Sequence, residues 1–242
     1  MIGAILNSCG ILLGGTIGLA SSKALSMRVE AQLRIVLASL TVIIGLRLTW
    51  LSLDGSAVQI LKQCVVLFLA LTLGKLTGKL FRLQKLSNHL GHRAHQHILS
   101  VQTSPVHTVN DGFQPCTVLF CAAPLGIVGA ALEGLSSSRF FYPLAVKAII
   151  DGFAAMGLVR VLGWGVLISA IPVFTFLGLL TLVSENLLAS SLAARGLLDS
   201  VNAVGGVLVF SVALVMLVLK RIELADYLPS LVIAPLLIRV WG

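Results

Sequence analysis

The sequence predicts an all-α fold, a polytopic transmembrane helix bundle that crosses the bilayer seven or eight times. Hydrophobic residues make up 57% of the 242 positions and charged residues 11%, and the mean hydropathy is +1.03. A soluble domain is about 45–50% apolar and about 25% charged, because polar side chains must cover its surface. The apolar residues also form long continuous segments, and the basic residues lie mainly between them. Hydrocarbon is therefore the expected solvent for most of the exterior.

Each predicted span is an apolar segment of suitable length, since about 20 residues at about 1.5 Å per residue cross the hydrocarbon. Helices are expected, because backbone polar groups in lipid must be satisfied within the segment, and a barrel would show alternating hydrophobicity. The predicted spans are 2–20, 33–52, 57–80, 114–134, 142–160, 162–183, 202–219 and 227–241. The last is short and contains Pro229 and Pro235, so it spans thinly or is re-entrant, which leaves seven or eight spans.

The first span predicts the orientation of the chain. A signal peptide would have Lys or Arg before its apolar segment, but none precedes this one. Positive charge follows the span instead, at Lys23, Arg28 and Arg34. More Lys and Arg then fall on the inner side than on the outer side. We expect a multi-pass protein of a bacterial inner (cytoplasmic) membrane with its N-terminus outside.

Residues 85–112 form the longest polar stretch and carry all five histidines of the chain, four of them clustered at positions 89, 92, 95 and 97. We expect a cytoplasmic, basic and His-rich linker here. It would separate a first three-helix part, residues 1–84, from a second part of four to five helices, residues 113–242. No Cys, Asp or Glu is interleaved with the histidines and their neighbours are basic, so we expect no metal site.

Lys147 and Asp151 are the first candidates for a binding site. They are four residues apart and therefore share one face of the fifth span. An ionisable group near the bilayer centre costs about 2.5–3.5 kcal/mol on insertion scales. One interpretation is a polar site in which Asp151 binds a cation or a proton. The alternative is a structural ion pair that only allows the helix to insert, or a Lys147 that extends to the headgroups.

Two prolines predict kinked or broken helices. Pro124 removes a backbone hydrogen bond in the fourth span, and the freed carbonyls beside Gly126 could line an ion site. The alternative is a kinked, tightly packed helix. The same two interpretations apply to Pro172. Ser169 can hydrogen-bond a carbonyl one turn away and so repair the kink at Pro172. Glu133, which ends the fourth span, is expected at the outer headgroups or at the mouth of a vestibule.

Asn7 and Asn202 lie at membrane depth in the first and seventh spans. An amide there needs a partner, so each is expected to bond to another helix, and each is also a candidate site residue. Gly10, Gly14 and Gly18 form a stripe at four-residue spacing, which predicts close packing within the chain or between subunits of a homo-oligomer.

Composition and motifs exclude several classes of function. The net charge of +8 lies mainly in the loops, which favours anionic lipid headgroups over nucleic acid as the partner. The four cysteines form no C-x-x-C pair, and no catalytic signature is present. We therefore expect no enzyme, no cofactor and no metal. The expected partners are the lipid bilayer and a small solute or ion.

A set of motifs in a fixed order resembles a known family, the uncharacterised bacterial membrane proteins of the YdfK/YqgA type (domain of unknown function 554). That family has a small or flexible residue where this chain has Pro124, and a shorter, less His-rich stretch at 85–112. The resemblance implies a multi-pass membrane protein and brings no substrate. The matching motifs are Met1-Ile-Gly-Ala-Ile-Leu-Asn7 with Gly14-Gly15, Phe120-Cys121 with Gly126-Ile-Val-Gly129, Lys147-x-x-x-Asp151-Gly152, Ser169-Ala-Ile-Pro-Val173, Asn202 with Gly205-Gly206, and Leu228-Pro-Ser-Leu.

The leading functional hypothesis is a transporter or channel for a small solute or ion with an intramembrane Asp site. The alternative is a non-transporting membrane scaffold or assembly partner, in which glycines and asparagines serve packing. A water-accessible cavity that reaches Asp151 would favour transport, and an Asp151 sealed against Lys147 would favour the scaffold.

Overall fold

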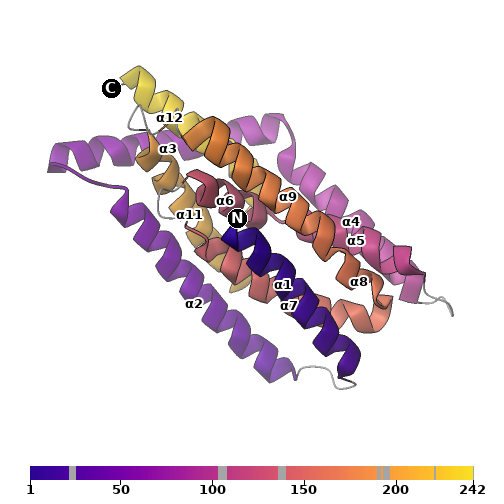
Figure 1. Cartoon of the computed structure of the whole chain (residues 1–242). Helices are drawn as coiled ribbons and strands as arrows, with labels where there is room; N and C mark the ends of the chain where they lie inside the picture. Colours follow the sequence, from indigo (N-terminus) through magenta and orange to yellow (C-terminus); the bar gives the residue numbers. More distant parts are fainter. Residues whose placement is uncertain are drawn as a thin grey trace.

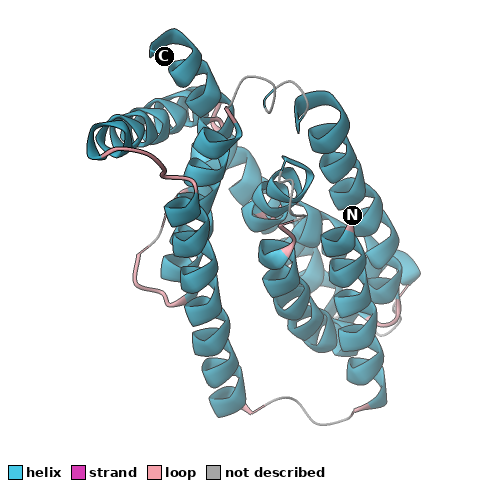
Figure 2. Cartoon of the chain, turned by 60° about the vertical axis from the view of Figure 1, so that its left-hand side comes forward, coloured by secondary structure: helices cyan, strands magenta, loops and turns pink. Residues whose placement is uncertain are grey.

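The computed structural model describes residues 1–21, 26–102, 108–135, 140–189, 192, 197–220 and 222–241, and all regular structure in these ranges is helical (Figures 1 and 2). The fold class predicted from the sequence is confirmed. The helices are α1 (Ile2–Ala20), α2 (Met27–Leu51), α3 (Ala57–Leu80), α4 (Leu83–Gln102), α5 (Val109–Cys121), α6 (Pro124–Leu135), α7 (Tyr142–Leu162), α8 (Gly165–Ile168), α9 (Ala170–Val183), η1 (Ser184–Ala189), α11 (Leu198–Met216), η2 (Leu224–Tyr227) and α12 (Ser230–Trp241).

In the described residues, five helical segments are long and apolar enough to cross a membrane, or six if the bent pair of α5 and α6 counts as one span. The five are α1, α2, α3, the continuous segment Gly165–Ala189, and α11. This count, by length and composition, is lower than the seven or eight spans expected from the sequence. The eighth predicted span becomes η2 and α12, and the 12 residues of α12 rise only about 18 Å. The 21-residue α7, which carries both members of the candidate ion pair, is also not among the five.

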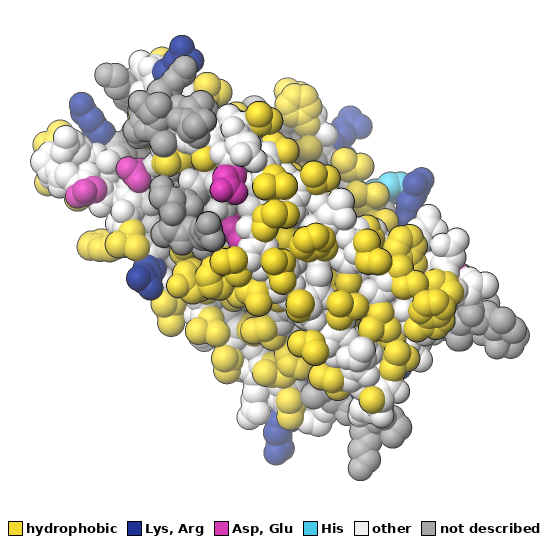
Figure 3. Space-filling view, viewed as in Figure 1, with side chains coloured by type: hydrophobic (Ala, Val, Ile, Leu, Met, Phe, Trp, Pro, Cys, Tyr) yellow, Lys and Arg dark blue, Asp and Glu magenta, His cyan; other side chains and the backbone are white. Residues whose placement is uncertain are grey.

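The exterior of the bundle is apolar. In the most apolar windows of α2 and α3, only 22% and 17% of the residues are buried inside the chain. Figure 3 shows hydrophobic side chains over the middle of the viewed face and Lys and Arg side chains around its edge. A face of this kind requires hydrocarbon as its solvent, as expected for a multi-pass membrane protein.

α1 and α7 pack closely against each other along their length. Cβ atoms on Gly10, Gly14 and Gly18 would collide with the backbone of α7 at Ala148, Gly152 and Met156. The four-residue spacing is the same on both helices, so the two backbones stay in contact over several turns. The glycine stripe thus serves packing within the chain. In lipid there is no hydrophobic driving force between helices, so close van der Waals contact, which small residues allow, holds them together.

Helices from both sides of the polar stretch 85–112 form one bundle. α2 packs on α11, where Gly45 faces Gly206 and the Thr49 hydroxyl donates to the Ala203 carbonyl at 3.3 Å. α3 packs on α12, with Gly74 against Ser230.

The stretch predicted as a linker forms the 20-residue helix α4 for most of its length. α4 packs on α5, with Ala94 and Ile98 buried. Its first turn is held by η2, since the Gln84 backbone N–H donates to Asp226 Oδ1 at 2.8 Å. Its apolar residues are too sparse for a span but suffice for one packed face.

Candidate functional site

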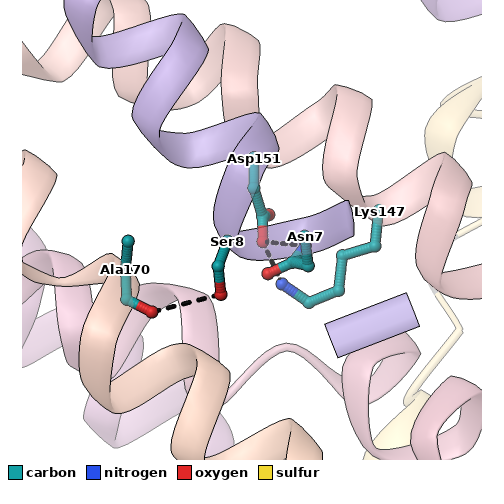
Figure 4. A network of polar contacts seen from close by, with 5 residues as sticks. All are labelled: Asn7, Ser8, Lys147, Asp151 and Ala170. Carbon is teal, nitrogen blue, oxygen red and sulfur yellow. Dashed lines mark hydrogen bonds and ion pairs between the residues drawn. The ribbon is translucent and has the colours of Figure 1, made fainter. Parts of the chain in front are cut away.

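A buried ion pair lies on the face of α7 that is turned toward α1 (Figure 4). The Lys147 ammonium donates to Asp151 Oδ2, and the two residues are 1% and 6% exposed. Their four-residue spacing on one helix brings them together, as the sequence indicates. Among the described residues Asp151 is the one hydrogen-bond acceptor of the Lys147 ammonium.

Asn7 joins α1 to this pair. Its Nδ2 donates to Asp151 Oδ2 at 2.9 Å, and the residue is fully buried. The same carboxylate oxygen therefore receives an ammonium and an amide. Asn7 Oδ1 is buried without a hydrogen-bond partner in the described part of the chain. The interhelical bond predicted for this asparagine is present, and one acceptor is left over.

The break between α5 and α6 lies beside the pair. The two helices meet at 59° across Ala122 and Ala123, directly before Pro124. The broken helix predicted at Pro124 is confirmed, because the proline has no N–H to continue α5 and is well suited to start α6. Last-turn carbonyls of α5 then lack partners within their own helix.

Gly126 makes room for the lysine. It is the third residue of α6, and a Cβ there would lie 2.8 Å from Lys147 Cε. Cys121, the last residue of α5, lies within electrostatic range of both Lys147 and Asp151. The pair is therefore surrounded by α1, α7 and the broken helix, an arrangement typical of binding sites in transporters.

A second irregularity occurs at Ser169, between α8 and α9. Pro172 has no N–H for the carbonyl of Ile168, the residue at which α8 ends. Ser169 donates from its hydroxyl to the Val166 carbonyl one turn away, at 2.6 Å, and not to the Ile168 carbonyl that Pro172 leaves free. The break therefore lies three residues before Pro172, and the chain remains one helical segment.

Ser8 connects α1 to this second irregularity and was not anticipated. Its hydroxyl donates to the Ala170 carbonyl at 3.2 Å (Figure 4). Consecutive residues of α1, Asn7 and Ser8, thus contact α7 and the start of α9. A serine among apolar residues gives no sequence signal for such a contact.

Two other polar residues make no hydrogen bond to the pair. Asn202 is on α11, which packs on α2, and its buried Oδ1 has no hydrogen-bond partner among the described residues. Glu133 was expected at the headgroups or a vestibule mouth, but it is 3% exposed. Its position seven residues after Gly126 puts both on one face of α6, and that spacing is the signal that predicts its burial.

Glu133 occupies the amino end of α1. Its Oε1 accepts from the Gly3 backbone N–H at 3.0 Å and lies 3.0 Å from the amino group of Met1. Its Oε2 is buried without a partner among the described residues.

The two main cavities between the described helices do not reach the ion pair. One cavity, of about 750 Å³, lies between α2, α7 and α11 and includes Ile150 and Ala154. Another, of about 580 Å³, lies between α3, α11 and α12. Neither is lined by Lys147 or Asp151. An Asp151 that is bonded to Lys147 and reached by neither cavity favours the alternative function, a non-transporting membrane scaffold.

The chemistry of the site is that of a carboxylate, an ammonium and an amide. Within the described ranges, no three His, Cys, Asp or Glu side chains come together as a metal site would need. The arrangement can exchange one cation for another at Asp151, or hold α1 against α7.

The chain is similar to known proteins over nearly its whole length, which includes the residues of this site. A family model described as "Protein of unknown function (DUF554)" matches residues 2–239. The chain is 30% identical to the "Uncharacterized protein YqgA" of Escherichia coli (strain K12), with 100% of this chain and 97% of that protein aligned. It is 25% identical to the "Uncharacterized membrane protein YdfK" of Bacillus subtilis (strain 168), over 99% of this chain and 96% of that protein. No solved structure matches the chain.

Proposed function

Because the chain belongs to the DUF554 family, for which no function is described, we propose a function from its own geometry: a transporter of a small ion or solute that binds a monovalent cation at Asp151. The observation that carries the proposal is the buried Lys147–Asp151 pair, bonded to Asn7 beside the break between α5 and α6. In this proposal the protein is not an enzyme, and it resides in a bacterial inner membrane with its N-terminus outside.

The energetic cost of the pair supports a functional role. Two ionisable groups in one buried stretch of helix are expensive to insert into hydrocarbon, and such groups in membrane proteins commonly mark ion paths, whereas a buried ion pair adds little net stability. A Lys that precedes an Asp by four residues is also the weaker order for stabilising a helix. Local helix stability is therefore a poor reason to keep both residues.

Lys147 acts in this proposal as an internal substitute for the transported cation. A proton or Na⁺ that binds Asp151 would displace the lysine ammonium from Oδ2, and the unpartnered Asn7 Oδ1 is available as a second oxygen ligand. The displaced ammonium would have the last carbonyls of α5 as acceptors, since Gly126 leaves the lysine room beside the break. Cation binding would thereby be coupled to the position of α5 and α6.

The closed pair corresponds in this proposal to an occluded state. Alternating access moves helices around a fixed site, and a state with the site closed to both sides lies between the open ones. The bend between α5 and α6 is the element beside the pair that can change its angle.

A second candidate function is a non-transporting assembly protein. It is favoured by the closure of the pair from both cavities and by the close glycine contacts between α1 and α7. In this reading Lys147, Asp151 and Asn7 fix the register of two helices and bind nothing.

Flux measurements on purified protein in liposomes separate the two candidates. Proton entry would be followed with the enclosed dye pyranine and sodium entry with ²²Na⁺, for wild type, Asp151→Asn and the exposed control Glu185→Gln. Transport predicts flux above protein-free liposomes in wild type and in the control. It also predicts a fall of about tenfold or more in Asp151→Asn, since one bond to a charged group contributes about 1.5–3 kcal/mol. Equal flux in all three removes Asp151 from the mechanism, and no flux in wild type favours the assembly protein.

A further inference from the structure

Glu133 is a second buried carboxylate on the same side of α1 as Asp151. It contacts α1 at Gly3, and Asp151 contacts α1 at Asn7. Four residues separate these contacts, so they are one turn, about 6 Å, apart along the helix axis. Glu133 is 3% exposed, and its Oε2 has no partner among the described residues.

Three helices form one continuous seam between the two carboxylates. Gly3 of α1 touches both Glu133 and Leu144, since a Cβ on it would lie 2.5 Å from Leu144 Cδ1 and 2.7 Å from Glu133 Oε2. Gly129 of α6 touches Leu144 in the same way, at 2.9 Å from Cγ. One turn further along α6, Gly126 touches Lys147.

Leu144 is the residue of α7 that packs at Gly3 and Gly129, beside Glu133. It is fully buried and precedes Lys147 by three residues, so it lies on the same face of α7. The glycines at positions 3 and 129 leave it room from both sides. Leu144 therefore packs at Gly3, where the free oxygen of Glu133 also lies, and the same face of α7 continues to Lys147.

We propose that Glu133 is an outer binding site for the cation that Asp151 takes up, and that Leu144 is the barrier between the two sites. The inference rests on the proposed transport function and adds a second ligand and a gate to it. An ionised carboxylate oxygen buried without a partner is costly, and a bound monovalent cation, either a proton or Na⁺, satisfies it. The structural alternative is a carboxylate that only caps the amino end of α1.

The seam is tested by cation flux in proteoliposomes, with pyranine for protons and ²²Na⁺ for sodium as separate arms. The variants are Glu133→Gln, Leu144→Ala and Asp151→Asn, with Glu185→Gln as an exposed acidic control at the start of η1. Glu133→Gln keeps an oxygen to accept the Gly3 N–H but loses the charge. We expect it to lower flux about tenfold, the loss of one charged ligand. We expect Leu144→Ala to raise the leak of the same cation severalfold, and the control to match wild type.

The outcomes separate this inference from the function on which it rests. Wild-type flux in Glu133→Gln together with loss in Asp151→Asn would overturn the inference and leave the transport site at Asp151. No flux in wild type would overturn both. If Glu133→Gln does not give monodisperse protein, Leu144→Ala decides. An unchanged cation leak in Leu144→Ala would show that Leu144 is not a barrier and would overturn the path through Glu133.

Discussion

Individual polar atoms, most of them on α1, α6 and α7, carry the functional argument. Asp151 Oδ2 accepts from Lys147 and from Asn7, while one oxygen of Asn7 and one of Glu133 are left without partners among the described residues. A buried ion pair adds little net stability compared with apolar residues of the same size, but the loss of one partner leaves a buried charge uncompensated. This asymmetry allows the structural and functional roles of the pair to be measured apart.

Single and double substitutions of the pair should differ sharply. Lys147→Met or Asp151→Leu alone should each lower the free energy of unfolding by about 3–5 kcal/mol, whereas the double variant should be close to wild type. Thermal unfolding in detergent measures this, with flux in liposomes as the second readout. The transport proposal predicts a folded but inactive double variant. A double variant with wild-type flux would show that the pair is structural.

The bond from Asn7 should contribute modestly to stability. Asn7→Leu removes the amide donor to Asp151 and also the unpartnered Oδ1, and hydrogen bonds between membrane helices average about 0.6 kcal/mol with a maximum of about 1.7. Denaturation in mixed micelles measures the change. A loss well above that range would mean that Asn7 supports more than one contact.

At the scale of helices, the molecule is organised by close backbone contacts. α1 lies on α7 through glycines spaced by four, and α2 lies on α11 through Gly45 and Gly206. Lipid is as apolar as the side chains, so these helices gain from tight packing and not from leaving water. The break between α5 and α6 is the exception, since there the backbone gives up helix bonds beside the polar pair.

Two glycine substitutions test this packing. A Cβ on Gly14 would overlap the carbonyl of Gly152, which as backbone cannot move aside, so Gly14→Ala should destabilise the fold by about 1–3 kcal/mol. Gly157→Ala on α7 is the matched control, because nothing lies within 4 Å of its Cβ position. It should gain up to about 1 kcal/mol from helix propensity. Equal melting temperatures for the two variants would contradict the close α1–α7 contact.

At the scale of the whole molecule, the apolar exterior and the distribution of basic residues set the position in the membrane. α2 has 25 residues and rises about 37 Å, enough to cross the hydrocarbon, so its two ends should lie on opposite sides. We expect the start of α2 on the inner side, because Lys and Arg are in excess after α1.

This orientation is testable by cysteine labelling in intact cells. In a background with the four native cysteines replaced, Asp54→Cys should react with a membrane-impermeant maleimide and Arg28→Cys should not until the cells are lysed. Both positions are exposed, so burial does not explain a difference. The opposite pattern would invert the topology, and labelling of both would show that α2 does not span.

Local features of the fold follow from the sequence, since hydropathy and proline chemistry act within one segment. The predicted segments 2–20 and 57–80 coincide with α1 and α3, and the break at Pro124 lies where the missing N–H requires it. The shared face of Lys147 and Asp151 is equally a matter of helix periodicity.

Contacts between distant residues could be decided only by the tertiary structure. Asn7 and Asp151 are 144 positions apart, and Gly3 and Glu133 are 130 apart. No periodicity in one segment says which helix packs on which, so the contact of Glu133 with the amino end of α1 and the contact of Ser8 with Ala170 were not readable beforehand. The sequence by itself determined that lipid surrounds this chain and which residues are costly there. Helix packing, which depends on the shapes of two surfaces at once, decided which of those residues meet.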